Sequence, residues 1–175
     1  LDQKLRLYRT MLEARMMNEA RAVGVPTPVV YDIDLGEASI IYEYIAGVKV
    51  KNILDKLADG EREKMNHHIG GLIGLMHRNG LIHGDLTTSN MLLTNNRVIY
   101  FIDFGLCEHS THIESKGVDL HLMKRALEST HFRISSSSFS EILEGYRKTA
   151  GIDAEETIKR VSLIEKRGRY ISERG

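Results

Sequence analysis

Two polar motifs, each next to an apolar run, constrain the fold of this chain more than any other feature. The first motif is HGDLTTSN at residues 83–90, and the second is DFG at residues 103–105. Residues 98–102, directly before the second motif, are typical of a buried strand because they are apolar or aromatic throughout. Such a strand would deliver the side chain of Asp103 to a site at its end. The sequence therefore predicts one site built from both motifs.

Three side chains in these motifs suit phosphoryl transfer from a nucleotide triphosphate. Asp85 can accept or orient a proton on an attacking hydroxyl or water, and Asn90 and Asp103 offer the hard oxygen ligands that magnesium prefers. In such a centre the protein contributes position and electrostatics, with little covalent work. The alternative is that both aspartates are turn residues and Asn90 is a cap, since Asp and Asn favour those places. We prefer the first interpretation because the two motifs occur together and in this order.

Composition narrows the class of protein. The 175 residues suggest one domain, or one small unit with two lobes. Lys and Arg number 24 together, as do Asp and Glu, so no net field draws the chain to nucleic acid or membrane. No apolar run approaches the roughly 18 residues of a bilayer span. The single cysteine, Cys107, fits a reducing compartment and a buried, unreactive thiol. We therefore expect a cytoplasmic protein with no membrane segment and, because Leu1 is not an initiator methionine, a piece of a longer polypeptide.

Hydrophobic periodicity and turn residues predict a mixture of helices and strands. The first helix would run over residues 2–23, with an apolar stripe that begins at Leu5 and Tyr8, and would end at Gly24. Further helices are predicted over residues 50–57, 61–79 (capped by Asp59), 118–129, 140–150 and 154–166 (capped by Asp153). Strands are predicted over residues 28–32, 40–45, 91–94 and 98–102, and a polar linker over 135–138. Glycines at positions 70, 71 and 74 would let a neighbouring element approach the longest helix closely.

Single residues outside the two motifs are open to more than one interpretation. Glu13 is the better candidate for the helix carboxylate that two-lobed nucleotide enzymes use to hold a lysine against the phosphates, and Glu19 is its rival. Asp119 would cap a helix, reach back to the backbone of the HGD turn, or do both. His83 is expected to be a structural hydrogen bonder rather than a base.

The C-terminal end of the chain concentrates positive charge. Lys166, Arg167, Arg169 and Arg174 stand there with one aromatic residue, Tyr170. A solvated chain end is the usual meaning of such a segment. Contact with RNA phosphates and a base is the other interpretation, and the sequence does not separate the two.

With these residues in view, the chain resembles the PRPK family, the small atypical kinase/ATPase subunit of the KEOPS complex, which is related to the RIO kinases. The resemblance covers essentially the whole chain. It rests on RT and EAR at residues 9–10 and 13–15, GVPTPVVY at 24–31, YEYI at 42–45, the HGDLTTSN motif, IDFGL at 102–106 and RGR at 167–169. The GVPTP run together with the TTSN loop is specific to this family rather than to kinases in general.

The resemblance implies an α+β, protein-kinase-like bilobal fold. Residues 1–45 would form a partial, truncated N-lobe, and residues 46–175 a mainly helical C-lobe. The family assists a transferase subunit that makes threonylcarbamoyl-adenosine on tRNA, chiefly as a magnesium-dependent ATPase and with serine/threonine kinase activity as well. The implied partners are that transferase subunit and a further small subunit, with possible tRNA contact through Arg167, Arg169 and Arg174.

The resemblance also assigns roles to the residues of the site, with ATP and Mg²⁺ as the implied cofactors. Asp85 would be the catalytic aspartate and Glu13 the carboxylate that bridges the lobes. Glu43 and Ile45 would lie in the hinge and contact adenine through their backbone, and Asn90 and Asp103 would hold the metal.

Two departures from the usual kinase pattern affect these expectations. No glycine-rich loop and no strand lysine precede the first helix, so we expect this stretch alone to bind ATP weakly. Typical kinases also carry a lysine two residues after the catalytic aspartate, where this chain has Thr87, and the short segment from Gly105 to Val118 has no Ala-Pro-Glu anchor. The lysine that is replaced by Thr87 and the missing Ala-Pro-Glu anchor both favour water or the protein itself over a free peptide as the phosphoryl acceptor.

Two other functions compete with this interpretation. A small-molecule phosphotransferase of the aminoglycoside or choline type shares the pattern HGDxxxxN, but only about seventy residues follow Asp103 here, too few for the usual substrate domain. A catalytically weak scaffold subunit is consistent with the missing lysine. Such a scaffold, however, has no need for Asp85, Asn90 and Asp103 together.

Overall fold

The computed structural model describes residues 2–172 of the chain, and the side chains of residues 4–167. The helices in this range are α1 (Asp2–Ala22), α2 (Asp59–Arg78), α3 (Ile113–Thr130), α4 (Ser135–Thr149) and α5 (Ala154–Ser172). The strands are β1 (Val30–Asp34), β2 (Ser39–Tyr42), β3 (Gly47–Lys49), β4 (Leu81–Ile82), β5 (Met91–Thr94), β6 (Ile99–Phe101) and β7 (Glu108–His109). Short 3₁₀ turns are η1 (Val50–Asn52), η2 (Leu54–Lys56), η3 (Thr88–Asn90) and η4 (Gly151–Asp153). The expected α+β class is confirmed.

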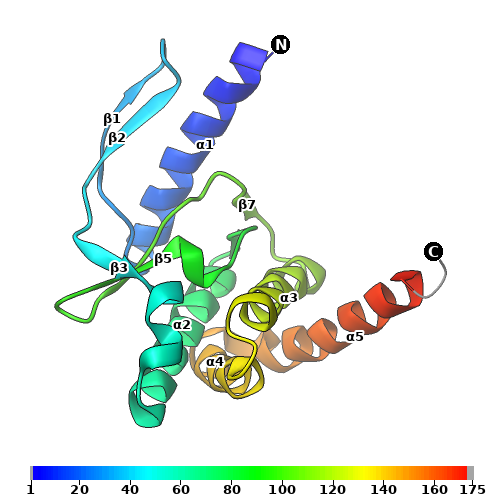
Figure 1. The fold of residues 1–175 in the computed structure, drawn as a ribbon. Coiled ribbons are helices and arrows are strands. Elements are labelled where there is room, and N and C mark those ends of the chain that lie inside the picture. Colours follow the sequence, from blue (N-terminus) through cyan, green and yellow to red (C-terminus); the bar gives the residue numbers. More distant parts are fainter. Residues whose placement is uncertain (1, 173–175) are drawn as a thin grey trace.

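The strands of the described residues form three small antiparallel sheets. β1 pairs with β2, β5 lies between β3 and β6, and β4 pairs with β7. Figure 1 shows the β1–β2 hairpin standing beside α1 at one end of the molecule, with α2 to α5 gathered at the other. Within the described range, no helix combines the length and the apolar character needed to cross a bilayer.

Helix α1 covers the N-terminal end of the core with only part of its predicted apolar stripe. Met16, Met17 and Ala20 are buried, whereas Leu5 and Tyr8 are 49% and 63% exposed. The prediction for the start of the stripe was therefore wrong, because the hairpin beside α1 is too small to cover it. The helix ends where expected, at Gly24, whose φ of +95° is a left-handed conformation that favours glycine.

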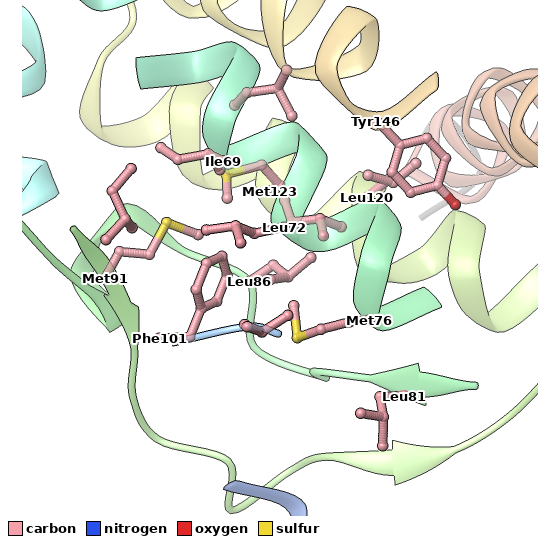
Figure 2. Close-up of a cluster of buried hydrophobic side chains, with 14 of the residues drawn as sticks. Ile69, Leu72, Met76, Leu81, Leu86, Met91, Phe101, Leu120, Met123 and Tyr146 are labelled. Carbon is pink, nitrogen blue, oxygen red and sulfur yellow. The ribbon is translucent and has the colours of Figure 1, made fainter. Parts of the chain in front are cut away.

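The main core lies between α2, α3, α4 and the β5–β6 pair. Figure 2 shows Leu72 of α2 gathered in this core with Leu86, Met91 and Phe101. Leu86 belongs to the first site motif and Phe101 ends the strand before the second, and both are fully buried. Since burying such a side chain stabilises the fold by about 1.5–3 kcal/mol, both motifs are anchored in the same rigid interior.

Helices α2 and α4 approach each other at glycines, as the sequence indicated. A Cβ atom at Gly70 would collide with the carbonyl oxygen of Ile142, and one at Gly145 would collide with the carbonyl oxygen of His67. Beside this contact, the Asn66 Nδ2 donates to Glu141 Oε2 at 2.7 Å. The two backbones are thus in direct contact, which holds the helix that precedes the site motif.

Several predicted boundaries were wrong. Residues 135–138 form the first turn of α4 instead of a linker, and α3 begins at Ile113 instead of residue 118. Residues 50–57 form two 3₁₀ turns, and Gly47 begins β3, a strand that was not among those predicted. Helix α2 starts at Asp59 itself, so this residue is not the cap. Asp153 accepts a hydrogen bond from the nearly buried Lys116 Nζ at 2.7 Å, which ties η4 to α3.

Candidate active site

The first site motif forms a tight turn that joins Asp85 to Asn90. The Asn90 side-chain amide Nδ2 donates to Asp85 Oδ2 at 2.8 Å and to the Asp85 carbonyl oxygen at 3.1 Å. The turn starts at Gly84, where φ is +79° and a Cβ atom would collide with the carbonyl oxygen of Leu106. Because the amide nitrogen of Asn90 is engaged with Asp85, its oxygen is the atom left to bind a cation.

Asp103 lies next to this turn, at the end of β6. The Ile102 N–H donates to the Asn90 carbonyl at 3.0 Å, which extends the β5–β6 pairing to the residue before Asp103. Asp103 is exposed and has a φ of +64°, in the left-handed region. Such a conformation costs a non-glycine residue about 1–3 kcal/mol and is typical of functional sites. The structure therefore brings Asp85, Asn90 and Asp103 together, as the motifs indicated.

Glu13 approaches the same place from α1. Burial raises its pKa, as does the nearby charge of Asp103, while a hydrogen bond from the Phe104 backbone opposes the shift. Its Oε2 also lies 3.7 Å from the position of a Cβ atom built on Gly105. Its rival Glu19 pairs instead with Arg15 at 2.7 Å and with His109 of β7 at 2.8 Å. Of the two candidates, only Glu13 is shown beside the DFG motif.

A buried carboxylate fixes the backbone of the HGD turn. Asp119 accepts hydrogen bonds from the N–H groups of His83 and Gly84, both at 2.9 Å, and its Oδ2 lies 3.0 Å from His77 Nε2. Asp119 lies inside α3, so the prediction of a helix cap was wrong and the prediction that it reaches the HGD turn is confirmed. His77 was not predicted, because its partner is 42 residues away and no local pattern marks the pair.

His83 is part of this scaffold rather than a proton carrier. Its Nδ1 accepts a hydrogen bond from the Asp85 N–H at 3.3 Å, and its ring lies 4.8 Å from that of Phe104. Burial lowers its pKa, although the surrounding carboxylates Asp119, Asp85 and Asp103 oppose the shift. This is the structural role that we expected. Cys107 is likewise inert, since burial raises the pKa of its thiol to about 12.

The two expected hinge residues line a cavity of about 380 Å³. Glu43 and Ile45 form one side, and Val98 and Tyr100 form part of the other. The Glu43 N–H already donates to the Val29 carbonyl at 2.8 Å, which leaves the Glu43 carbonyl as its free backbone group. A larger hollow of about 780 Å³ lies between α1 and β1, and neither Asp85 nor Asp103 lines it.

The donor set fits a magnesium ion that shares its ligands with a nucleotide. Among the described residues there is no group of three or more His, Cys, Asp or Glu that would hold a metal unaided. Magnesium is usually bound through one or two protein oxygens, with phosphates and water completing the octahedron. The amide oxygen of Asn90 and the carboxylate of the exposed Asp103 are such a pair.

The basic tail is only partly within the described residues. Arg167 Nη2 pairs with Glu114 Oε1 at 2.7 Å, and Arg160 pairs with the same carboxylate at 3.3 Å. The side chain of Arg169 and the whole of Arg174 lie outside the described part of the chain. Of the three arginines expected to contact tRNA, only Arg167 can therefore be placed, and its charge is already shared with an acidic neighbour.

Comparison with known proteins identifies the family. The model of the RIO domain matches residues 3–124. The chain is 47% identical over 171 residues to the KEOPS complex subunit Bud32 of Pyrococcus abyssi, covering 97% of this chain and 77% of that protein. It is 41% identical over 171 residues to a probable serine/threonine-protein kinase BUD32 homolog of Archaeoglobus fulgidus, covering 98% of this chain and 81% of the relative.

A longer relative, named as bifunctional, extends the comparison. The chain is 42% identical over 170 residues to a probable bifunctional tRNA threonylcarbamoyladenosine biosynthesis protein of Methanothermobacter thermautotrophicus, of which it covers only 30%. The match to the RIO domain and the near full-length likeness to Bud32 proteins agree with the geometry of the turn and the DFG motif. The chain therefore belongs to the RIO-domain family, among its Bud32-type atypical kinases.

Proposed function

We propose that this chain is a magnesium-dependent ATPase and atypical serine/threonine protein kinase that supports threonylcarbamoyl-adenosine modification of tRNA. The observation that carries the proposal is the convergence of three oxygen-bearing side chains. The Asn90 amide bonds the Asp85 carboxylate at 2.8 Å, and the Asn90 carbonyl accepts from the residue before Asp103. The printed names of the relatives, a KEOPS complex subunit and a tRNA threonylcarbamoyladenosine biosynthesis protein, support the biological setting.

In this proposal each residue has one task. Asp85 accepts or orients the proton of the attacking hydroxyl or water, and its bond to Asn90 holds its carboxylate in place. Asn90 and Asp103 hold Mg²⁺, which would neutralise charge on the transferring phosphoryl group. Glu13 is the carboxylate that a lysine would pair with, and its pKa is raised by burial and by the charge of Asp103. The Glu43 carbonyl and the Ile45 N–H bind the adenine edge.

The acceptor is proposed to be water or the protein itself. Thr87 stands where typical kinases have a lysine, and the residues between Gly105 and α3 form only the short β7, which pairs with β4. A free peptide would therefore find little backbone to dock against.

We further propose that residues 1–45 act as a partial N-lobe and 46–175 as the C-lobe. The proposed partners are a transferase subunit, a further small subunit and tRNA through Arg167, Arg169 and Arg174. The protein would act in the cytoplasm, which suits its single cysteine.

The test is ATP turnover by the full-length protein, with and without its transferase partner. Asp103→Ala should lower kcat by about a hundredfold or more, because a metal carboxylate supplies charge stabilisation that nothing nearby replaces. Asp32→Ala is the matched control, since this aspartate is exposed on β1 and lines the hollow to which neither Asp85 nor Asp103 contributes. It should stay within about twofold of the native rate, as is usual for surface substitutions.

Three other outcomes would contradict the proposal in different ways. Turnover that requires an aminoglycoside or choline would identify a small-molecule phosphotransferase. Partner binding without any turnover would identify a scaffold subunit. Equal turnover in the native protein and Asp103→Ala would show that this acidic turn is not the reactive centre.

A further inference from the structure

A buried histidine at the C-terminal end of α3 contacts the middle of the turn that joins Asp85 to Asn90. His131 is the first residue after α3, and its backbone N–H donates to the Leu127 carbonyl at 2.7 Å. Its imidazole Nε2 lies 2.9 Å from the Thr88 hydroxyl, and its Nδ1 lies 2.5 Å from Asp55 Oδ2 in η2. The ring of His131 thus connects the end of α3 to Thr88, 43 residues earlier in the chain, and to Asp55, 76 residues earlier.

The chemistry of the carboxylate fixes the direction of one hydrogen bond. A carboxylate only accepts, so the Nδ1–H of His131 donates to Asp55. The Thr88 hydroxyl can bond Nε2 in either form of the ring, because it donates to a neutral imidazole and accepts from a protonated one. His131 and Thr88 are each only 1% exposed, so water does not compete for these atoms. Loss of either partner would leave a buried polar group unsatisfied.

Thr88 is well placed to transmit this order to the reactive groups. It is the first residue of η3, between Asp85 and Asn90. The next turn of backbone closes through the Asn90 N–H, which donates to the Thr87 carbonyl at 3.1 Å. The hydroxyl of Thr88 therefore anchors the turn to the buried core, and the two ends of that turn carry the side chains of Asp85 and Asn90.

We propose that His131, bonded to Thr88 and oriented by Asp55, is a positioning residue that holds Asp85 and Asn90 in their working arrangement. This inference rests on the proposed function of the turn. His131 does not face the reacting atoms, and its effect passes through the turn. The segment from Glu43 to Ile45, which would bind adenine, is not part of this contact. Loss of the contact should therefore slow the chemical step while ATP binding is retained.

The first experiment compares two substitutions of Thr88 in steady-state ATP turnover by the full-length protein with its partner. Thr88→Val keeps the shape of the side chain and removes the hydroxyl that bonds Nε2, whereas Thr88→Ser keeps the hydroxyl. We expect Thr88→Val to lower kcat by about tenfold with KM for ATP changed by less than about twofold, because small displacements of reactive groups are costly. Thr88→Ser should restore kcat to within about threefold of the native value, since the bond is retained.

A matched control separates positioning from stability. Thr149→Val removes a half-buried hydroxyl that donates to the Gly71 carbonyl at 2.6 Å, on the α2–α4 side of the molecule. It should lower the melting temperature and leave kcat unchanged. If Thr88→Val and Thr149→Val lower the melting temperature alike and neither changes kcat, the contact is only structural and the inference is wrong.

A second variant keeps the test decisive if Thr88→Val does not fold. Asp55 is 47% exposed at its side chain, so Asp55→Ala should fold, yet it frees the ring of His131 to rotate. We expect a fall in kcat of about threefold, and recovery in Asp55→Asn, whose amide oxygen still accepts from Nδ1–H. Native kcat in Asp55→Ala would overturn the inference.

The failure of the inference can be told from the failure of the proposed function. If Asp103→Ala abolishes turnover while Thr88→Val and Asp55→Ala keep the native kcat, the function stands and the role of His131 is refuted. If Asp103→Ala keeps full turnover, the turn is not the reactive centre, and both fall.

Discussion

The helix pair α2–α4 and the pair formed by α1 with the β1–β2 hairpin differ in how closely they are packed. At Gly70 and Gly145 the backbones of α2 and α4 touch, with no room for even one added carbon atom. Between α1 and β1 there is instead a hollow of about 780 Å³, and Tyr31 on its wall is 66% exposed. One region resists any change of volume, and the other presents an open, partly apolar surface.

This difference matters because the candidate site draws on both regions. Asp85 and Asn90 are held by the tightly packed side, through Leu86, Asp119 and the core. Glu13 comes from α1, on the loosely packed side. Since close-packed interiors resist deformation, we expect the Asp85–Asn90 pair to be the rigid part of the site and Glu13 to be the part whose position can change.

The largest effect is expected from filling the contact between α2 and α4. Gly70→Ala places a Cβ atom into the Ile142 carbonyl and 2.9 Å from the Tyr146 nitrogen, so we expect a loss of about 3 kcal/mol or more in the free energy of unfolding. Gly71→Ala, one residue along the same helix, meets nothing closer than 3.9 Å. Because alanine favours a helix over glycine, it should stabilise the protein by about 0.5–1 kcal/mol. Urea unfolding of both variants makes the comparison, and equal effects would show that the helices are not in backbone contact.

A smaller effect is expected from substitution of Glu13, and it should stabilise the protein, in contrast to Gly70→Ala. Its pKa in the folded protein is raised above the value of 4.5, so its contribution to stability is full below pH 4.5 and is lost as the pH rises through the folded pKa. Glu13→Gln removes this loss. Because the group is only half-buried, we expect a rise in melting temperature of about 1–2 °C at pH 7, vanishing near pH 4.

Two measurements complete this prediction. Glu63→Gln, an exposed position on α2, is the control and should not change the melting temperature measurably. In the proposed function Glu13→Gln should also lower ATP turnover, so that stability and activity change in opposite directions. A Glu13→Gln variant that is less stable at pH 7 would show that burial and the charge of Asp103 do not destabilise the ionised carboxylate.

The smallest effect is expected on the open surface beside α1. Tyr31→Ser removes an exposed aromatic ring from β1 and should change the free energy of unfolding by less than about 0.5 kcal/mol, as surface substitutions usually do. Chemical denaturation of the isolated protein measures it. A loss above about 1 kcal/mol would mean that this ring is packed in solution, and the contrast with the α2–α4 contact would disappear.

Whether the sequence predicted a feature depended on how far apart in the chain the interacting residues lie. The strand before Asp103 and the turn before Asn90 carry local signals, apolar runs and motif spacing, and both were placed correctly. The contact at Gly70 was also anticipated, because a glycine inside a helix calls for a packing reason. Roles assigned to the site residues beyond their placement remain predictions.

The errors arise where tertiary contacts override local preference. Serines favour turns, so residues 135–138 suggested a linker, yet Ser138 is fully buried and the segment is held as the first turn of α4. The bond between Ser137 Oγ and the Ile134 carbonyl, at 3.1 Å, closes that turn. His131 gave no signal at all, because its partners are brought to it only by the folded chain.

The pairing of β4 with β7 has a consequence for how this protein can vary in length. Leu81 and Ile82 of β4 pair with His109 and Glu108 of β7, and this pairing closes a loop that contains both site motifs. Closing a loop of twice the length costs only about 0.6 kcal/mol more, so an insertion in the exposed bend at residues 95–97 would leave the β4–β7 pairing intact. Since Asn95 and Asn96 line the cavity with Glu43 and Ile45, such an insertion would reshape the pocket proposed to bind the nucleotide, while the scaffold that carries the acidic groups stays in place.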